Sequence, residues 1–152
     1  MKIIEVNSDR NFMWAFGKEL KTSCIIRSRI NLPPAYPEHE DGTPGTISYQ
    51  PIQFPLGMWL VKKPEPTTNP LMAPFFIPTM AHQIVICSDG SRFDDWGYGI
   101  HYDAQYEETW GCMHLYSEDD VQWLAGQINE AMDGGEPVSI RIDDKSFIGG
   151  NT

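Results

Sequence analysis

Proline is concentrated in two stretches of this 152-residue chain, and that distribution limits the secondary structure that the chain can form. Residues 31–49 contain four prolines and the turn pair Asp41-Gly42, and residues 64–78 contain five more prolines. Proline lacks a backbone N–H group, so it interrupts both helices and central strands. We therefore expect two long irregular connections, with regular elements confined to the segments around them.

Most of the remaining segments have the composition of strands, because they are short and rich in apolar and β-branched residues. The turn residues Ser88-Asp89-Gly90 follow one of these segments directly. The expected strands are residues 3–6, 22–30, 57–63, 83–87 and 98–102, with a last strand at 137–142.

One segment, Glu118 to Met132, has the pattern of a helix. Ser117 is a favourable N-cap, and acidic residues fill the first turn. Apolar residues recur at helical spacing on one face, and Asp133-Gly134-Gly135 ends the pattern. The order of strands, one helix at about 118–132 and a last strand predicts a β-rich α+β fold. We expect a single domain over residues 1–145, with a mixed sheet of sandwich or barrel-like form and a short tail at 146–152.

Composition excludes several classes of protein. Eleven basic and 21 acidic residues give a formal charge of −10, which disfavours binding to nucleic acid or to anionic lipid. Eighteen consecutive apolar residues do not occur, so we expect no membrane-spanning helix. The first residues lack the apolar stretch of a signal peptide, so we expect synthesis in the cytoplasm, followed by delivery to the periplasm or cell wall or by incorporation into a virion. The three cysteines form no CxxC pair and no disulfide framework.

The segment Gly99 to Leu115 carries the candidate chemistry. His101 stands near the end of an expected strand, and Gly111-Cys112 follows after a polar and aromatic connection. A thiol becomes a useful nucleophile when a neighbouring imidazole accepts its proton. Backbone N–H groups around Gly111 and Cys112 are candidates for stabilising the oxyanion of an acyl intermediate.

Residues 100–142 resemble the C-terminal half of an L,D-transpeptidase (YkuD-like) catalytic domain. The matching features are Ile100-His101, the turn Thr109-Trp110-Gly111-Cys112, the capped helix and the strand beginning Gly135-Glu136-Pro137-Val138. Residues 54–61 resemble the strand entry of the same family, so the match covers roughly the last two thirds of the chain. The short connection between His101 and Cys112 is most similar to compact phage-associated or effector-type members.

The resemblance implies a role for each matched residue. Cys112 would be the nucleophile and His101 its base, with Gly111 supporting the oxyanion hole and the carbonyl of Tyr102 orienting the imidazole. Larger members have His where this chain has Trp110, and often Arg or Asn where it has His114. The candidate substrate-binding residues are Trp110, Thr109, His114 and Trp96.

The expected function is therefore that of a cysteine-dependent hydrolase or transpeptidase of peptidoglycan stem peptides, of the L,D-carboxypeptidase or endopeptidase type. It would act through a thioester and need no metal or organic cofactor. This mechanism requires the Cys112 sulfur to contact the His101 imidazole in an accessible cleft.

Other interpretations remain open at this point. The same fold is compatible with a non-catalytic module of a phage tail or baseplate, whose partners are phage structural proteins or the cell wall. Cys112 is then a small core residue, as Cys24 and Cys87 are expected to be. A metal cluster of Cys112, His114, His101 and Asp103 fits no standard zinc spacing. A papain-like peptidase requires Cys before His, the reverse of the order here. His39 and His82 have no evident context.

Overall fold

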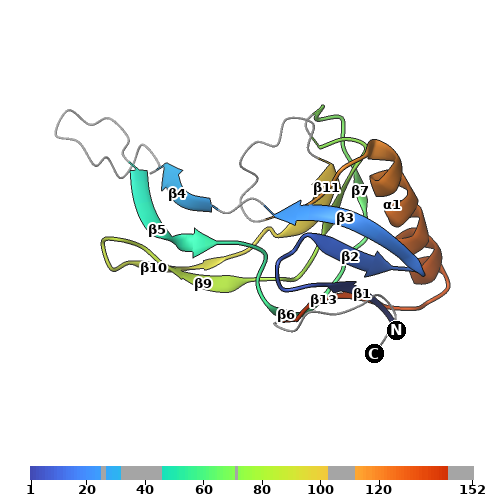
Figure 1. Ribbon diagram of the computed structural model, residues 1–152, viewed down its shortest axis with the longest axis horizontal. Coiled ribbons are helices and arrows are strands. Elements are labelled where there is room, and N and C mark those ends of the chain that lie inside the picture. Colours follow the sequence, from blue (N-terminus) through green and yellow to red (C-terminus); the bar gives the residue numbers. More distant parts are fainter. Residues whose placement is uncertain (25–26, 32–45, 71, 103–111, 144–152) are drawn as a thin grey trace.

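The computed structural model describes residues 1–24, 27–31, 46–70, 72–102 and 112–143. A curled sheet of nine strands forms the body of the molecule, and two separate two-stranded ribbons extend from it (Figure 1). The only helix of the described residues is α1 (Glu118–Asp133). The β-rich α+β fold expected from the sequence is therefore confirmed.

The nine-stranded sheet contains two parallel strand pairs, and its other neighbouring strands are antiparallel. One parallel pair joins β1 to β13 and the other joins β11 to β12. Across the sheet the order is β6 (Gly57–Leu60), β13 (Val138–Ile142), β1 (Lys2–Val6), β2 (Phe12–Ala15), β3 (Lys18–Cys24), β12 (Met113–Leu115), β11 (Gly99–Tyr102), β8 (Phe75–Pro78) and β7 (Glu65–Pro66).

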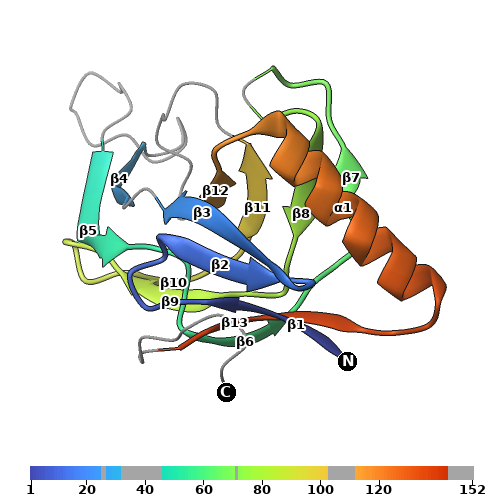
Figure 2. The same cartoon turned by 45° about the vertical axis from the view of Figure 1, so that its right-hand side comes forward.

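The two ribbons lie at the end of the molecule opposite α1 in both views (Figures 1 and 2). One pairs β4 (Arg27–Asn31) with β5 (Thr46–Ile52), and the other pairs β9 (Gln83–Ile86) with β10 (Arg92–Asp95). The turn expected at Ser88-Asp89-Gly90 connects β9 to β10, so that prediction is confirmed.

Helix α1 packs across one face of the curled sheet (Figure 2). The Oγ of Ser117 accepts a hydrogen bond of 3.0 Å from the backbone N–H of Asp120, which confirms the expected N-cap. The helix buries Val121, Leu124, Ala125 and Ile128. These residues share one core with the strand residues Ile4, Met13, Ile77, Ile100, Met113 and Ile140.

The hairpin of β2 and β3 was not expected from the sequence. Its two turn residues, Phe16 and Gly17, have φ angles of 50° and 77°. Two successive positive φ angles are typical of the tight turn that joins twisted antiparallel strands. Phenylalanine rarely adopts this conformation, so the sequence carries no recognisable turn signal here. In the structure the Phe16 ring packs edge-on against Trp123 of α1, which holds the turn against the helix.

The expectations for the proline-rich stretches were only partly correct. Residues 46–49 belong to β5, and residues 64–78 contain β7 and β8, so neither stretch is irregular throughout. Proline is tolerated there because Pro66 lies in the edge strand β7 and Pro78 is the last residue of β8. The single strand expected at 22–30 is divided between β3 and β4.

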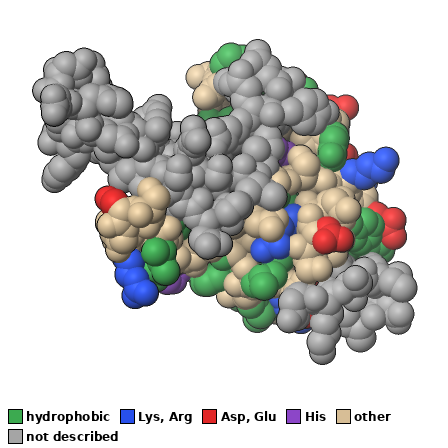
Figure 3. Space-filling view, turned by 60° about the vertical axis from the view of Figure 1, so that its left-hand side comes forward, with side chains coloured by type: hydrophobic (Ala, Val, Ile, Leu, Met, Phe, Trp, Pro, Cys, Tyr) green, Lys and Arg blue, Asp and Glu red, His purple; other side chains and the backbone are tan. Residues whose placement is uncertain are grey.

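The excess of acidic residues is not gathered into one patch on the face seen in Figure 3, where basic and acidic side chains are interspersed. Within the described ranges, no helix is long and apolar enough to cross a membrane. The proposed domain boundary at residue 145 falls outside those ranges.

Candidate active site

Two histidines lie side by side on neighbouring interior strands of the sheet. In the parallel pair of β11 and β12, His101 stands directly opposite His114, and their ring centroids are 4.9 Å apart. Both residues are only 1% exposed. Phe76 of β8 is the neighbour of His101 on the other side, with ring centroids 6.0 Å apart. We call Phe76, His101 and His114 the histidine row.

The histidine row faces away from α1. Successive residues of a strand point to opposite faces of the sheet. Ile100 and Met113, which alternate with the histidines, belong to the core that contains the apolar face of α1. The histidines therefore occupy the other face, where they are separate from the main core.

Cys112 directly precedes β12, and His114 follows it by two residues. The thiol donates a hydrogen bond to the carbonyl oxygen of Gly97, with a sulfur–oxygen distance of 3.6 Å. Within the described part of the chain, its hydrogen bond goes to Gly97 and not to either histidine. The contact between sulfur and imidazole that the sequence analysis required is thus not formed as a hydrogen bond in this structure.

The thiol is also less accessible than expected, because Cys112 is only 6% exposed. It is followed directly by β12, which lies between β3 and β11 and so is an interior strand of the sheet. Burial raises the pKa of the Cys112 thiol to about 12, against an opposing hydrogen bond from the backbone of Gly99. The charges of Cys24 and Asp95 raise this pKa further. The resting form at neutral pH is therefore the protonated thiol.

His101 has a defined hydrogen-bonding state. Its Nδ1 lies 2.7 Å from the carbonyl oxygen of Tyr102. A carbonyl oxygen only accepts hydrogen bonds, so Nδ1 carries a hydrogen and the neutral ring presents Nε2 as its acceptor. This is the contact that an orienting carbonyl at position 102 would make. The catalytic roles of His101, Tyr102 and Cys112 remain predictions.

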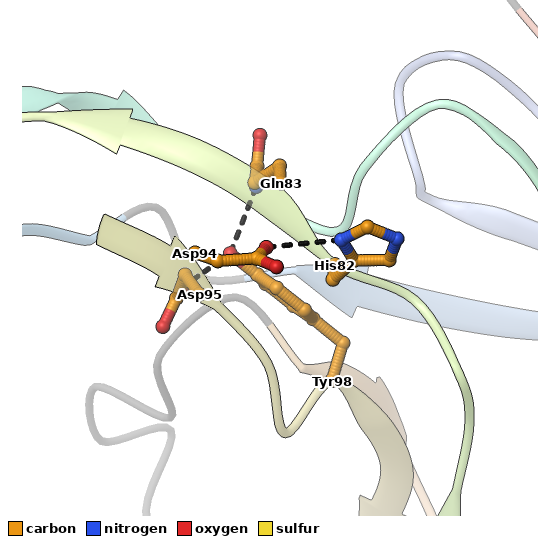
Figure 4. Close-up of polar contacts among 5 residues, drawn as sticks. All are labelled: His82, Gln83, Asp94, Asp95 and Tyr98. Atoms are coloured by element: carbon orange, nitrogen blue, oxygen red, sulfur yellow. Dashed lines mark hydrogen bonds and ion pairs between the residues drawn. The ribbon is translucent and has the colours of Figure 1, made fainter. Parts of the chain in front are cut away.

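A buried tyrosine fixes the chain segment around Gly97, whose carbonyl accepts the hydrogen bond from the Cys112 thiol. Tyr98 is 1% exposed, and its hydroxyl donates a hydrogen bond of 2.5 Å to Asp95 (Figure 4). The side-chain amide of Gln83 donates a hydrogen bond of 2.8 Å to the same hydroxyl. Because Gly97 lies between Asp95 and Tyr98 in the chain, these contacts fix the position of its carbonyl next to Cys112.

Trp96, a predicted substrate-binding residue, lies one position before Gly97 and is 49% exposed. Its ring stacks on the ring of His82, with centroids 4.1 Å apart and an angle of 4° between the planes. His82 Nδ1 lies 2.9 Å from Asp94 Oδ1 (Figure 4). No context for His82 is evident in the sequence. The turn at 88–90 is the sequence feature that could have revealed the contact between His82 and Trp96, because a hairpin with that turn places residue 82 opposite residue 96.

Several predicted residues lie outside the described ranges: Thr109, Trp110, Gly111 and Asp103. In the described ranges, no group of three His, Cys, Asp or Glu side chains is placed to hold a metal ion, so the cluster of Cys112, His101 and His114 has no support as a metal site. Cys24 packs against the core and Cys87 is buried, as expected.

Comparison with known proteins gives similarity only at the level of solved structures. No family model matches the chain, and no curated protein matches it. The helical cell shape determining protein Pgp2 from Campylobacter jejuni is similar with a TM-score of 0.48 and 14% identity, over 96% of this chain and 48% of that one. An L,D-transpeptidase from Xylanimonas cellulosilytica is similar with a TM-score of 0.44 and 11% identity, over 93% of this chain and 59% of that one. This chain thus spans about half to three fifths of the length of these proteins.

Proposed function

We propose that this chain is a cysteine-dependent enzyme that cleaves or exchanges an amide bond in a peptidoglycan stem peptide. The observation that carries the proposal is the hydrogen bond from His101 Nδ1 to the carbonyl of Tyr102. It fixes the imidazole so that Nε2 is the proton acceptor, in a strand adjacent to the one that Cys112 enters.

The proposed reaction has two stages. In the first, the Cys112 thiol transfers its proton to His101 Nε2 while sulfur attacks the amide carbonyl carbon, and the carbonyl electron pair moves to oxygen. The C–N bond then breaks as the electron pair returns, and the leaving amine takes the proton from His101, which leaves a thioester. In the second stage, water or an acceptor amine attacks the thioester carbonyl carbon and gives a proton to His101 Nε2. The C–S bond then breaks, the sulfur takes that proton to restore the Cys112 thiol, and the product leaves as a carboxylic acid or an amide.

The high pKa of the Cys112 thiol determines how His101 must act. Because the thiol is protonated at neutral pH, the nucleophile is not a preformed thiolate. His101 must remove the proton as the sulfur approaches the substrate, so only the neutral imidazole is active. The thiol must also exchange its hydrogen bond to the Gly97 carbonyl for one to the imidazole.

The substrate is proposed from the resemblance of residues 54–61 and 100–142 to the L,D-transpeptidase family. In that family the attacked carbonyl belongs to a residue of the stem peptide, and the reaction uses no metal or organic cofactor. Hydrolysis would give a carboxypeptidase or endopeptidase, and aminolysis would give a cross-link.

A second candidate function is favoured by the burial of Cys112. A structural cysteine has the same features: Cys112 is 6% exposed, and its protonated thiol donates a hydrogen bond to a backbone carbonyl. On this alternative, the chain is a non-catalytic module of a phage tail or baseplate that binds the cell wall or a structural partner.

Digestion of purified peptidoglycan distinguishes the two functions. Sacculi are incubated with the wild-type protein or with the Cys112→Ala, His101→Ala or Cys87→Ala variant, and the muropeptides are separated and weighed by mass spectrometry. Cys87→Ala is the matched control, since Cys87 is also buried (5% exposed) but lies at the end of the β9 ribbon.

The enzyme proposal predicts new muropeptides with the wild-type protein and with Cys87→Ala, and none with the other two variants. Identical profiles for all four proteins, together with cosedimentation of each protein with the sacculi, would establish the non-catalytic module instead. Thermal unfolding of each variant shows whether a lost activity comes from a lost fold.

A further inference from the structure

We propose that the stacked rings of His82 and Trp96, with the carboxylate of Asp94, form a subsite for a pyranose ring of a glycan strand. We call these three residues the ribbon platform. The inference deepens the proposed function: the identity of the glycan as peptidoglycan rests on that function, whereas the binding of a sugar ring rests on the ribbon platform itself.

The ribbon platform is a preformed flat surface. The rings of His82 and Trp96 are parallel within 4° at a centroid distance of 4.1 Å. Trp59 of β6 contacts His82 edge-on, with centroids 5.5 Å apart, and so holds the stack against the body of the molecule. His82 covers one face of the Trp96 ring, and Trp96 is nevertheless 49% exposed. A large aromatic surface is therefore available to a ligand without rearrangement.

Asp94 supplies a polar group at the rim of this surface. Its carboxylate accepts a hydrogen bond of 2.9 Å from His82 Nδ1 (Figure 4). Hydrogen bonds from His82 and also from Trp96 hold the pKa of the Asp94 carboxyl below its ordinary value. The charged carboxylate has lone pairs beyond those that these two donors use, and its side chain is 42% exposed. His82 Nε2 is a second polar group at the rim, because Nδ1 is engaged with Asp94.

This combination matches the chemistry of a sugar ring. A pyranose has an apolar face of C–H groups and a rim of hydroxyl and amide groups. The face stacks on the exposed Trp96 ring while a rim hydroxyl donates to Asp94. A phosphate-bearing ligand is disfavoured by the Asp94 charge and by the net charge of −10. A purely apolar ligand would desolvate the carboxylate without giving it a partner, which is costly.

The ribbon platform adjoins Gly97, the residue whose carbonyl accepts the hydrogen bond of the Cys112 thiol. Trp96 precedes Gly97, and the carbonyl of Gly97 lies 3.6 Å from the Cys112 sulfur. Tyr98, held by Asp95 and Gln83, anchors the same segment from the opposite side of the ribbon. A sugar ring on Trp96 would therefore bind beside the chain segment whose carbonyl contacts the sulfur.

Binding of a soluble oligosaccharide tests the proposal. The probe is the β-1,4-linked tetramer of N-acetylglucosamine, which carries no stem peptide, and binding is measured by calorimetry and by NMR of the tryptophan indole N–H signals. The variants are Trp96→Ala, Asp94→Asn and Cys112→Ala, and the matched control is Tyr116→Ala, which removes another exposed aromatic side chain (47% exposed) from outside the ribbon platform.

We expect the wild-type, Cys112→Ala and Tyr116→Ala proteins to bind the tetramer equally, and Trp96→Ala to bind at least tenfold more weakly. Asp94→Asn should weaken binding about threefold to tenfold, since it replaces a charged acceptor with a neutral one. Equal binding by Trp96→Ala and the wild-type protein, or no binding up to about 10 mM sugar, would overturn the proposal.

Two further comparisons separate this inference from its alternatives. A lysine-bearing dipeptide that competes with the sugar in a salt-dependent manner and with higher affinity would assign the ribbon platform to cations instead. Sugar binding without any Cys112-dependent cleavage of peptidoglycan would support the subsite and contradict the enzyme. Cleavage without sugar binding would support the enzyme and contradict the subsite.

Discussion

The buried histidine row and the exposed ribbon platform use the same residue in opposite settings. In both, the Nδ1 of a histidine lies within hydrogen-bond distance of an oxygen. His101 is 1% exposed and its oxygen is a neutral carbonyl, whereas the side chain of His82 is 40% exposed and its oxygen belongs to a charged carboxylate. The first environment suits proton transfer at a dry site, and the second suits recognition of a ligand from water.

This difference shows that burial, and not the hydrogen-bond pattern, separates the two proposed roles. A hydrogen bond in the buried site is surrounded by low-dielectric material and is costly to leave unmade. The corresponding bond in the ribbon platform competes with water and contributes little to stability. Changes in the histidine row should therefore have large effects, and changes in the ribbon platform should affect mainly ligand binding.

The largest contrast is expected in activity. Replacing His101 with Gln removes the base, so kcat for stem-peptide cleavage should fall by about 10² to 10⁴. His82→Gln should raise KM for a glycan-linked substrate by less than about tenfold and change kcat little. Steady-state kinetics on soluble muropeptides measures both. A similar loss of kcat in the two variants would remove the distinction between the sites.

A smaller contrast is expected in stability, between two glycines. A Cβ atom at Gly99 would lie 2.5 Å from the Phe76 ring and 2.7 Å from the carbonyl oxygen of Ile77, so Gly99→Ala should cost about 1–3 kcal/mol. A Cβ atom at Gly126 in α1 meets nothing within 4 Å, so Gly126→Ala should stabilise by about 0.5–1 kcal/mol. Urea unfolding of the two variants checks both signs. Equal stability would mean that the histidine row is loosely packed.

The Cys112 thiol should make stability depend on pH in the alkaline range. Its pKa is raised from 9.0 to about 12 in the folded protein, so the folded state retains a proton that the unfolded state releases between these values. This contribution is complete below pH 9 and is lost as pH rises, at about 1.4 kcal/mol per pH unit.

Urea unfolding of the wild-type and Cys112→Ala proteins at pH 8, 9 and 10 measures the difference. The alkaline slope should be shallower in the variant. Parallel slopes for the two proteins would show that the thiol is less buried than the structure indicates. Alkylation of Cys112 by iodoacetamide should rise about tenfold per pH unit over the same range.

The smallest effect is expected for Asp94→Asn in the absence of ligand. The Asp94 carboxylate is exposed, and its hydrogen bond to His82 competes with water, so the melting temperature at pH 7 should change by less than about 1 °C. Differential scanning calorimetry checks this. Because the pKa of Asp94 is lowered, any difference should disappear as pH falls below that pKa. A large loss of stability would mean that the ribbon platform is a structural element.

Local signals in the sequence predicted the elements that have strong local causes. Helix α1 was predicted because its cap, its apolar face and its glycine stop agree with one another, and the last strand and the turn at 88–90 were predicted for similar reasons. The hairpin at Phe16-Gly17 was missed because its turn is stabilised by contact with Trp123, a residue more than 100 positions away.

The candidate site was predictable only as a set of residues. The resemblance of residues 100–142 to a known family, more than the spacing of His101 and Cys112, indicated which side chains to consider. Pairing of β11 with β12 places His101 opposite His114, two residues after Cys112. The burial of the sulfur and its bond to Gly97 depend on the order of strands across the sheet, which no local pattern specifies. His82 was overlooked because its partners come from the opposite strand of a hairpin and from β6.

The parallel pair of β1 and β13 has a consequence for biosynthesis. Glu5 of β1 binds Arg141 of β13 across 136 positions of sequence, so the first strand waits for its neighbour until nearly all of these residues have left the ribosome. Pairing of β1 with β2 is local and can form early, but the other edge of β1 stays unpaired until β13 is made. Contacts this distant in sequence form slowly, so this edge is open to pairing with other chains during synthesis.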